Sequence, residues 1–256
     1  MLVSKEKEMY GVGKVFSTKN FGDLVVTKHI NSRTVHVKFI DTGYETATEL
    51  KHIRTGQVRD RWKPSVFGVG VIGELPISHG GKHDKEYVFW KGILERCYDE
   101  KYHSKQPTYK DCCVSEDFKY YPYFKGWCNK QIGFDQDGWQ LDKDILIKGN
   151  KLYSEATCCF VPPEINSLVL KADRIRGKYL IGVYHDTSKI HKRFSARVSK
   201  NGKHKRFGSY LTPEEAFAVY KREKEKYIKE VANKWKDQIE PRVYEALMNY
   251  QVEITD

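Results

Sequence analysis

One short segment of the chain places arginines at a spacing that can bind a polyanion. The segment Arg193–Ser199 alternates polar and apolar residues, which is the pattern of a β-strand that buries one face. Such a strand turns Arg193, Ser195 and Arg197 outward and the apolar residues between them toward a core. A guanidinium group forms paired hydrogen bonds with a guanine edge or with a phosphate. The spacing therefore predicts a strand face that can lie in the major groove of a duplex.

A hairpin turn surrounded by cationic side chains follows this strand. Asn201-Gly202 is typical of a two-residue turn between antiparallel strands. The polar side chains around the turn are Lys200, Lys203, His204 and Lys205. We expect them to contact phosphates, which set the register of a protein on a duplex without reading its sequence.

The positive charge of the chain is concentrated around the same segment. The protein has a net charge of +11 and a pI near 9.2. Residues 171–206 hold twelve Lys or Arg against two acids, which leaves +10 in this stretch. Such a basic protein is expected to meet a polyanion. Because the charge follows alternating strands and not an amphipathic helix, nucleic acid is a better candidate than a membrane surface.

The elements that would position these arginines form a small sheet and a long helix. Three short strands are predicted at Tyr179–Tyr184, Arg193–Ser199 and Arg206–Tyr210. Thr212-Pro213-Glu214-Glu215 combines three helix-start signals, namely a threonine cap, an early proline and a glutamate three residues after the cap. The helix is predicted to run to about Trp235, and a last helix follows near Arg242–Tyr250.

This part of the chain resembles the AP2 DNA-binding domain of plant transcription factors and phage homing endonucleases. The resemblance covers about Ile181–Ala232. Four motifs carry it: G-V-Y at Gly182–Tyr184, R-F-S-A-R-V at Arg193–Val198, R-F-G-S-Y at Arg206–Tyr210 and T-P-E-E-A-F-A-V-Y at Thr212–Tyr220. It implies a three-stranded sheet that reads double-stranded DNA.

By position, the resemblance transfers the family's DNA contacts to five residues of this chain: Tyr184, Arg193, Arg197, Ser199 and Arg206. Tyr184 and Ser199 stand where plant members have arginine, so the base sequence that those members read does not transfer. With Lys203 and Lys205 at the hairpin, these residues form the expected DNA interface.

The middle of the chain resembles phage HNH endonucleases of the His-Me finger type. The corresponding stretches are W-K-G-I-L-E-R-C-Y at Trp90–Tyr98, F-K-Y-Y-P-Y-F-K-G-W at Phe118–Trp127, L-D-K-D-I at Leu141–Ile145, G-N-K-L-Y-S-E-A-T-C at Gly149–Cys158, and Asn166. The match spans about 80 residues and implies a ββα fold. In such a site one divalent metal stabilises the scissile phosphate while a general base activates water.

The resemblance also implies roles for individual residues of this ββα fold. Asp142 would be the metal carboxylate, Asn166 the helix ligand, and Lys143 would occupy the slot of the histidine base. Asp144 would replace a missing ligand or act as the base. Magnesium is the expected ion because carboxylate and amide oxygens favour hard cations. Thr157 stands where the group has asparagine.

Three functions remain open at this point. The two resemblances together imply a phage-encoded, homing-type, metal-dependent DNA endonuclease. Because lysine replaces the usual histidine, the first alternative is a catalytically inactive DNA-binding regulator on the same scaffold. The third is an RNA-binding protein, since a small β-domain and a basic hairpin can also contact RNA.

The N-terminal residues read as a small β-domain. Strands are predicted at Asp23–Ile30, Arg33–Ile40 and Tyr44–Thr48, which suggests a barrel of SH3 or Tudor type. A glycine-rich linker over Phe67–His83 and helices over Asp84–Asp99 and Ser115–Gln131 follow.

The expected fold class is thus α+β. The expected domains are a β-domain at 1–65, an HNH-like ββα domain at 66–170, an AP2-like sheet with its helix at 171–236, and a C-terminal helix at 237–256.

The cysteines and the apolar segments indicate whether a zinc site, a membrane span or a signal peptide is to be expected. The six cysteines lie at positions 97, 112, 113, 128, 158 and 159, and none forms a C-x-x-C pair. We therefore expect buried, reduced thiols and no zinc site. No apolar run approaches the ~20 residues that span a bilayer, and the first residues lack a signal-peptide pattern. The expected location is the cytoplasm of the host cell.

Overall fold

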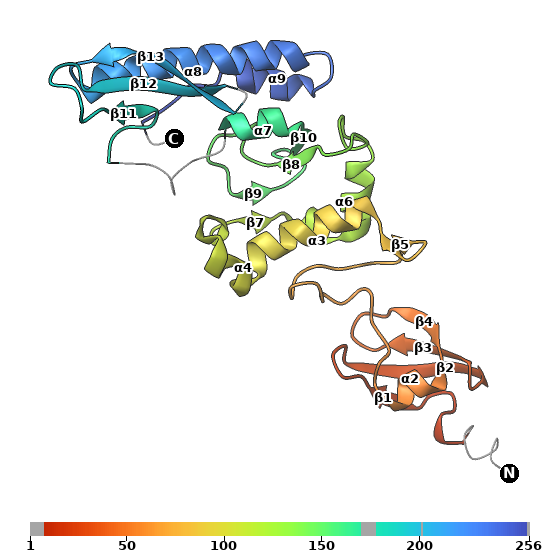
Figure 1. The fold of residues 1–256 in the computed structure, drawn as a ribbon. Coiled ribbons are helices and arrows are strands. Elements are labelled where there is room, and N and C mark those ends of the chain that lie inside the picture. Colours follow the sequence, from red (N-terminus) through yellow and green to blue (C-terminus); the bar gives the residue numbers. More distant parts are fainter. Residues whose placement is uncertain (1–7, 170–177, 201, 255–256) are drawn as a thin grey trace. The chain divides into compact units, whose positions relative to one another are not determined.

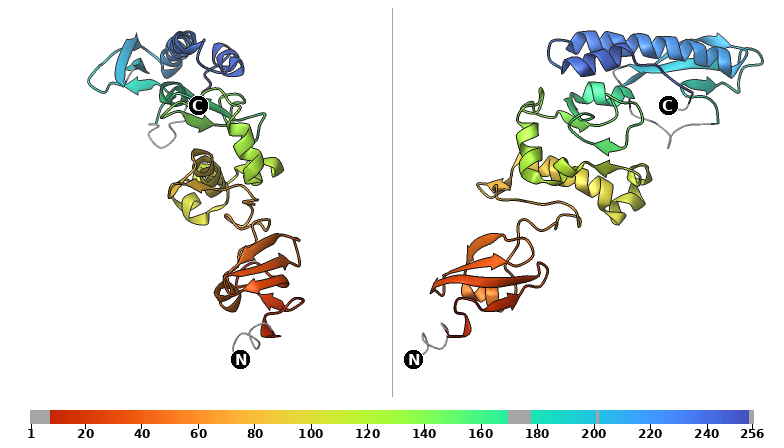
Figure 2. Two further views of the ribbon diagram at one scale, coloured as in Figure 1. Left: turned by 90° about the vertical axis from the view of Figure 1, so that its right-hand side faces the viewer. Right: turned by 180° about the vertical axis from the view of Figure 1, so that it is seen from behind.

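The structure is a computed structural model that describes residues 8–169, 178–200 and 202–254. It is a mixed α+β protein with several small sheets. Its internal contacts divide the chain into two compact units, Met1–Gly126 and Trp127–Asp256. Figures 1 and 2 show the elements of each unit. The two units are described separately below.

An antiparallel sheet forms the first part of the N-terminal unit. Its strands are β1 (Val15–Ser17), β2 (Asp23–Asn31), β3 (Thr34–Phe39) and β4 (Glu45–Thr48), paired in the order β1-β2-β3-β4. A short helix, α2 (Leu50–Arg54), follows β4. Every second residue of β2 and β3 is buried near the middle of the sheet, as the alternation in the sequence predicts.

The predicted closed barrel is not formed by the described residues. β1 and β4 lie at opposite edges of the sheet, and they are only three and four residues long. Leu50 and Ile53 of α2 join the buried cluster of the sheet, so a helix covers the core. A barrel would need its edge strands to pair with each other, and strands this short offer few such hydrogen bonds.

The remaining elements of the N-terminal unit are mostly helical. They are a small hairpin of β5 (Ser78–His79) and β6 (Lys82–His83), the helices α3 (Lys85–Tyr98) and α4 (Glu100–Lys105), the turn η1 (Pro107–Tyr109), the strand β7 (Cys113–Val114), the helix α5 (Glu116–Lys119) and the start of α6 (Tyr121–Cys128). The helix predicted at Asp84–Asp99 is confirmed as α3.

The single helix predicted over Ser115–Gln131 is wrong, because the structure has two helices there. Tyr120 between them has an extended backbone, with φ −93° and ψ 110°. Pro122 lies in the first turn of α6 and has no backbone N–H to donate to a preceding turn. The proline therefore starts a second helix and cannot continue the first.

The C-terminal unit begins with a ββα segment. Its strands are β8 (Gln140–Asp142) and β10 (Cys159–Val161), which pair antiparallel, and its helix is α7 (Pro163–Val169). A short strand, β9 (Leu152–Tyr153), lies in the connection between β8 and β10. The name ββα segment is used below for β8, β10 and α7.

A three-stranded antiparallel sheet and two helices complete this unit. The strands are β11 (Val183–His185), β12 (Phe194–Lys200) and β13 (Lys203–Tyr210), in the order β11-β12-β13. The helices are α8 (Pro213–Trp235) and α9 (Pro241–Met248). The left view of Figure 2 shows the sheet and α9 on two sides of α8.

The predicted start of α8 is confirmed in detail. The hydroxyl of Thr212 accepts a hydrogen bond of 3.2 Å from the backbone N–H of Glu215. The Glu215 carboxylate in turn accepts one of 3.4 Å from the backbone N–H of Thr212. This reciprocal capping box satisfies two donors that a helix start leaves without partners.

One hydrophobic core joins the ββα segment to the sheet and helices of the same unit. The buried cluster includes Val161 and Ile165 of the ββα segment, Ala196 of β12, Ile228 of α8 and Leu247 of α9. Glu164 at the start of α7 also accepts hydrogen bonds from two residues at the end of α8, Lys234 and Trp235. The ββα segment is therefore held rigidly to the helix that supports the sheet.

Across the part of the chain that the structure describes, none of the helices combines the length and the apolar character needed to cross a bilayer.

Candidate nucleic-acid interface

The register of the C-terminal sheet decides which side chains share its solvent-facing side. Ala196 and Val198 of β12 are fully buried in the core with α8. The residues between them therefore point to the opposite side. On that side Arg197 lies opposite Arg206 of β13, and Tyr184 of β11 lies opposite Ser195. We call this side, with Tyr184, Arg197, Ser199, His204 and Arg206, the outer face.

Arg197 is held against an aromatic ring of the neighbouring strand. Its Cζ atom lies 3.4 Å from the ring centroid of Tyr184. A planar guanidinium group stacks on an aromatic face through cation–π attraction and dispersion. The Tyr184 side chain remains 46% exposed. The stack therefore orients the arginine and leaves its hydrogen-bond donors beside an accessible ring.

A bulge in β13 places a hydroxyl group where it can hold Arg206. Phe194 pairs with Tyr210 while Ala196 pairs with Phe207, so β13 contains one extra residue there. Gly208 has φ +71°, which a side chain rarely tolerates. The hydroxyl of Ser209 beside it accepts a hydrogen bond of 2.8 Å from Arg206 and one of 3.3 Å from Lys189. Two cations are thereby gathered at one edge of the sheet.

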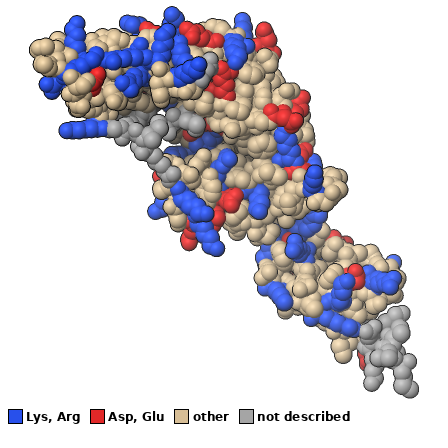
Figure 3. Space-filling model, viewed as in Figure 1, with Lys and Arg blue, Asp and Glu red and all other residues tan. Residues whose placement is uncertain are grey.

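In the described part of the chain, the acids near this face do not form ion pairs with its arginines. Among residues 8–169, 178–200 and 202–254, no carboxylate forms an ion pair with Arg193, Arg197 or Arg206. The acid of the preceding loop, Asp186, accepts a hydrogen bond of 2.6 Å from Ser188. That bond, with Lys189 and Arg206 nearby, lowers the pKa of Asp186. Figure 3 shows lysine and arginine side chains gathered over β12 and β13.

Three of the predicted DNA contacts have the expected environment. Arg193 and Ser199 are exposed, and Arg193 Nε donates a hydrogen bond of 3.2 Å to the carbonyl of Ile190. Arg197, between them in the strand, is half-buried by its stack on Tyr184. The arginine-rich stretch at 171–177 and Asn201 of the predicted turn lie outside the described residues.

Ser195 does not lie in the expected environment. Its exposed fraction is 0%, although alternation turns it to the outer side with Arg197. The side chain is short, and the strand register sets Tyr184 directly across from it. Its Oγ has no hydrogen-bond partner among the described residues. The expectation that Ser195 is solvent-facing is therefore wrong, because larger neighbours cover it.

The two hairpin lysines point away from the arginines. Lys203 and Lys205 lie opposite Lys200 and Val198, which face α8. Lys205 Nζ lies 5.3 Å from the ring of Phe207, which packs against the core on that side. Both lysines are exposed. They add to the positive field of the hairpin, but they do not belong to the outer face.

Sequence reasoning missed two side chains that shape this face. Ser209 holds Arg206, and Lys189 joins it from the loop before β12. The glycine in R-F-G-S-Y was the available signal, because a glycine inside a strand often marks a bulge.

In the ββα segment, the structure places Asp142 at the end of β8, opposite Cys159. Asp142 Oδ1 accepts hydrogen bonds of 2.7 and 2.8 Å from the backbone N–H groups of Asp144 and Ile145. Burial raises the pKa of Asp142, against the effect of these two bonds. One carboxylate oxygen is therefore engaged in shaping the turn after β8.

Lys143, which would fill the base slot, is buried and fully engaged. It is 7% exposed, and its ammonium forms an ion pair with Asp144. It also donates a hydrogen bond of 3.0 Å to the carbonyl of Asn150 and lies 5.6 Å from the ring of Tyr153. These contacts hold the loop between β8 and β9. An ammonium in this position is an acid and a donor, not a proton acceptor.

Among the described residues of this segment, Asn166 of α7 has a buried acceptor atom without a hydrogen-bond partner. Its Nδ2 donates a hydrogen bond of 2.5 Å to Gln140, which shares one face of β8 with Asp142. Its Oδ1 is buried and has no partner among the described residues. Together Asp142 and Asn166 offer a carboxylate and an amide oxygen, which suit Mg²⁺. In the described part of the chain, no three His, Cys, Asp or Glu side chains gather as a metal site.

The cysteines of the ββα segment are not exposed nucleophiles. Cys158 and Cys159 are buried, and burial raises the pKa of the Cys158 thiol to about 12. Such thiols stay protonated at neutral pH. Cys113 is exposed, so the prediction that the cysteines are buried is wrong for this residue.

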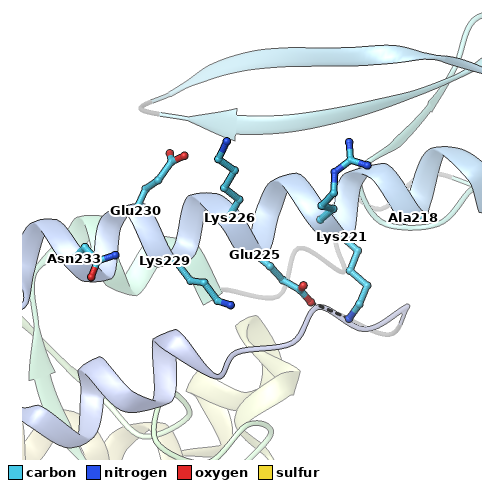
Figure 4. A pocket seen from close by; sticks show the side chains of 8 residues that line it. Ala218, Lys221, Glu225, Lys226, Lys229, Glu230 and Asn233 are labelled. Carbon is cyan, nitrogen blue, oxygen red and sulfur yellow. Dashed lines mark ion pairs between the residues drawn. The ribbon is translucent and has the colours of Figure 1, made fainter.

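A surface hollow of about 550 Å³ in the C-terminal unit runs along α8 and is lined mainly by charged residues. Figure 4 shows Lys226 pointing toward the β12–β13 hairpin and the Lys221–Glu225 ion pair beside the C-terminal segment. Lys221 donates a hydrogen bond of 2.7 Å to the carbonyl of Val252, and Glu225 accepts one of 2.9 Å from its N–H. This ion pair anchors the C-terminal segment to α8.

Comparison with known proteins adds no relative. No protein-family model, no curated protein and no solved structure matches this chain.

Proposed function

We propose that this protein binds double-stranded DNA through the outer face of the β11–β13 sheet. The observation that carries the proposal is the Arg197–Tyr184 stack beside Arg206, on a face whose arginines have no acidic partner among the described residues. The concentration of positive charge in residues 171–206 supports it. The resemblance of this sheet and α8 to the AP2 domain supports it independently.

The proposed binding mode follows from the size of the sheet. The major groove of DNA, about 12 Å wide, admits a β-ribbon. Arg197 and Arg206 are paired across β12 and β13, so one guanidinium group can reach a base edge while the other contacts a phosphate. Arg193 and Lys189, at the margin of the sheet, would contact the phosphate backbone. Lys203 and Lys205 would contribute attraction at longer range.

The test is duplex binding by fluorescence anisotropy at several salt concentrations. Arg197→Ala and Arg206→Ala should each weaken binding about 10-fold and lower the salt slope by about 0.9 if the side chain meets a phosphate. Arg222→Ala removes an exposed arginine from α8 and is the matched control. Unchanged affinity in both sheet variants, or equal loss in the control, would contradict the assignment. Competition with RNA tests the RNA-binding alternative.

A second candidate function is metal-dependent cleavage of the bound DNA. The unpartnered Oδ1 of Asn166, on the helix that contacts the Asp142 face of β8, favours it. In this proposal Asp142 and Asn166 hold Mg²⁺, which supplies Lewis acidity at the scissile phosphate. Residues 127–169 contain no histidine, and Lys143 is bonded to Asp144. The lack of a histidine in this segment and the ion pair of Lys143 with Asp144, the other candidate base, favour the alternative of a catalytically inactive DNA-binding regulator.

An assay for nicking of supercoiled plasmid with Mg²⁺ or Mn²⁺ distinguishes the endonuclease hypothesis from the regulator hypothesis. An endonuclease should nick, and Asp142→Asn or Asn166→Ala should abolish nicking without weakening duplex binding. The regulator hypothesis predicts that the wild-type chain binds duplex DNA and does not nick it with either metal.

A further inference from the structure

A second hollow lies in the N-terminal unit, beside the β1–β4 sheet. Its volume is about 460 Å³, within the size range of ligand sites. Two stretches of chain form its walls, the loop before β2 and the turn after α2. The lining residues are Lys19, Asn20, Phe21, His52, Gly56, Gln57, Val58 and Arg59.

The hollow is lined by basic side chains and by no acid. Lys19, His52 and Arg59 contribute the basic groups. Among the described residues, neither Lys19 nor Arg59 has an ion-pair partner. Such a cluster of cations keeps a positive potential that attracts anions.

Two acids close in sequence to the lining residues have partners of their own. Glu49 forms an ion pair of 3.0 Å with Lys51. Asp60 is buried and accepts hydrogen bonds from the hydroxyl of Thr42 and, at 2.8 Å, from the backbone N–H of Trp62. Neither carboxylate forms an ion pair with Lys19 or Arg59, although Glu49 lies close enough to His52 to interact with it electrostatically.

The walls of this hollow are fixed by backbone contacts. The N–H of Lys19 donates a hydrogen bond of 2.9 Å to the carbonyl of Gly56, and the N–H of Gln57 donates one of 2.8 Å to the carbonyl of His52. Gly56 has φ +63°, and a Cβ there would lie 3.2 Å from the Lys19 nitrogen. Only glycine fits this close approach without strain. The two walls are thus pre-organised relative to each other.

We infer that this hollow is a second DNA-binding site, which takes the phosphodiester backbone. Lys19 and Arg59 would form charge-assisted hydrogen bonds to one phosphate, and His52 would add a ring N–H donor. The identity of the polyanion rests on the proposed function of the C-terminal sheet, whereas the anion preference rests on the hollow alone. Since the contacts are to phosphate, this site should bind DNA without preference for sequence.

The experiment is a titration of the isotope-labelled full-length chain with a short DNA duplex, followed by amide NMR shifts. The amides of Lys19, Gly56 and Gln57 should shift with the same affinity for duplexes of unrelated sequence. In anisotropy measurements Lys19→Gln with Arg59→Gln should lower the salt slope by about two and weaken binding about 10-fold.

The matched control removes two exposed cations of the same unit that do not line the hollow. Lys28→Gln with Arg33→Gln changes the net charge equally and should leave affinity nearly unchanged. An equal loss of DNA affinity in both double variants would overturn the proposed site. It would indicate that DNA responds only to the general positive electrostatic field of the unit. Shifts in β12 and β13 with none at the hollow would overturn this inference alone. Shifts at the hollow with none in the sheet would overturn the proposed sheet interface alone, and no shifts anywhere would overturn both.

Discussion

The outer face of the C-terminal sheet and the ββα segment belong to the same unit, but their polar side chains have different partners. On the outer face Arg197 and Arg206 are oriented by a ring and a hydroxyl, neither of which neutralises charge. In the ββα segment Lys143 is buried against Asp144, and Asp142 bonds to its own turn. Oriented but unneutralised cations are available to a ligand, whereas groups satisfied internally stabilise the fold. The difference favours the sheet as the main functional surface.

The largest expected effect tests the structural role of Lys143. Lys143→Ala removes the ammonium from a carboxylate, a carbonyl and an aromatic ring, so the free energy of unfolding should fall by about 2–3 kcal/mol. Urea unfolding measures it. Normal stability combined with lost nicking would instead make Lys143 a functional residue and erase the contrast between the two regions.

A smaller effect is expected at Asp142. Asp142→Ala removes the acceptor of two backbone N–H groups and should cost about 1–2 kcal/mol, whereas Asp142→Asn keeps an acceptor. The pKa of Asp142 in the folded protein lies above the ordinary 3.8. The contribution of this group to stability is therefore fully present below pH 3.8 and is lost as pH rises through the folded pKa, because the carboxylate must then be charged while buried. The stability of Asp142→Asn relative to wild type should therefore increase from acidic to neutral pH. A constant difference across that range would refute the buried charge.

Glu164 should show the opposite pH dependence. The hydrogen bond from Lys234, then that from Trp235, lowers its pKa below the ordinary 4.5. Its contribution to stability is thus present above pH 4.5 and is lost as pH falls through the folded pKa. Glu164→Gln should destabilise by about 1 kcal/mol at neutral pH, and the difference should close in acid. If the difference persists in acid, the charge of Glu164 is not what joins α7 to α8.

The smallest effect concerns Tyr184. Tyr184→Leu removes the ring under Arg197 and should weaken duplex binding about 5-fold, as the loss of ~1 kcal/mol of cation–π attraction predicts. Tyr184→Phe keeps the ring and should bind normally. If the phenylalanine variant binds as weakly as the leucine variant, the hydroxyl and not the stack contributes the affinity.

Local signals in the sequence predicted much of the sheet and its helix. The capping box of Thr212 and Glu215 and the burial of Ala196 and Val198 follow from capping and period-two rules, which act between near neighbours. The orientation of Lys205, away from the outer face, could not be predicted in this way. It depends on the strand register, which only the complete hairpin defines.

Other features depend on contacts that are distant in the sequence. The burial of Ser195 depends on Tyr184 across the sheet, and the open N-terminal sheet depends on α2 covering its core. In the ββα segment the series of motifs suggested which residues to examine. It could not show that Lys143 is buried and engaged, because Asn150 and Tyr153 come from a later part of the loop.

Hydroxyl-radical footprinting with and without a DNA duplex tests the central claim most directly, because it reads side-chain exposure. Tyr184 on the outer face is 46% exposed, and Tyr123 in the N-terminal unit is 40% exposed and serves as the internal control. A duplex bound to the outer face should strongly reduce oxidation of Tyr184 and leave Tyr123 unchanged. Equal oxidation of Tyr184 with and without saturating duplex would contradict the account.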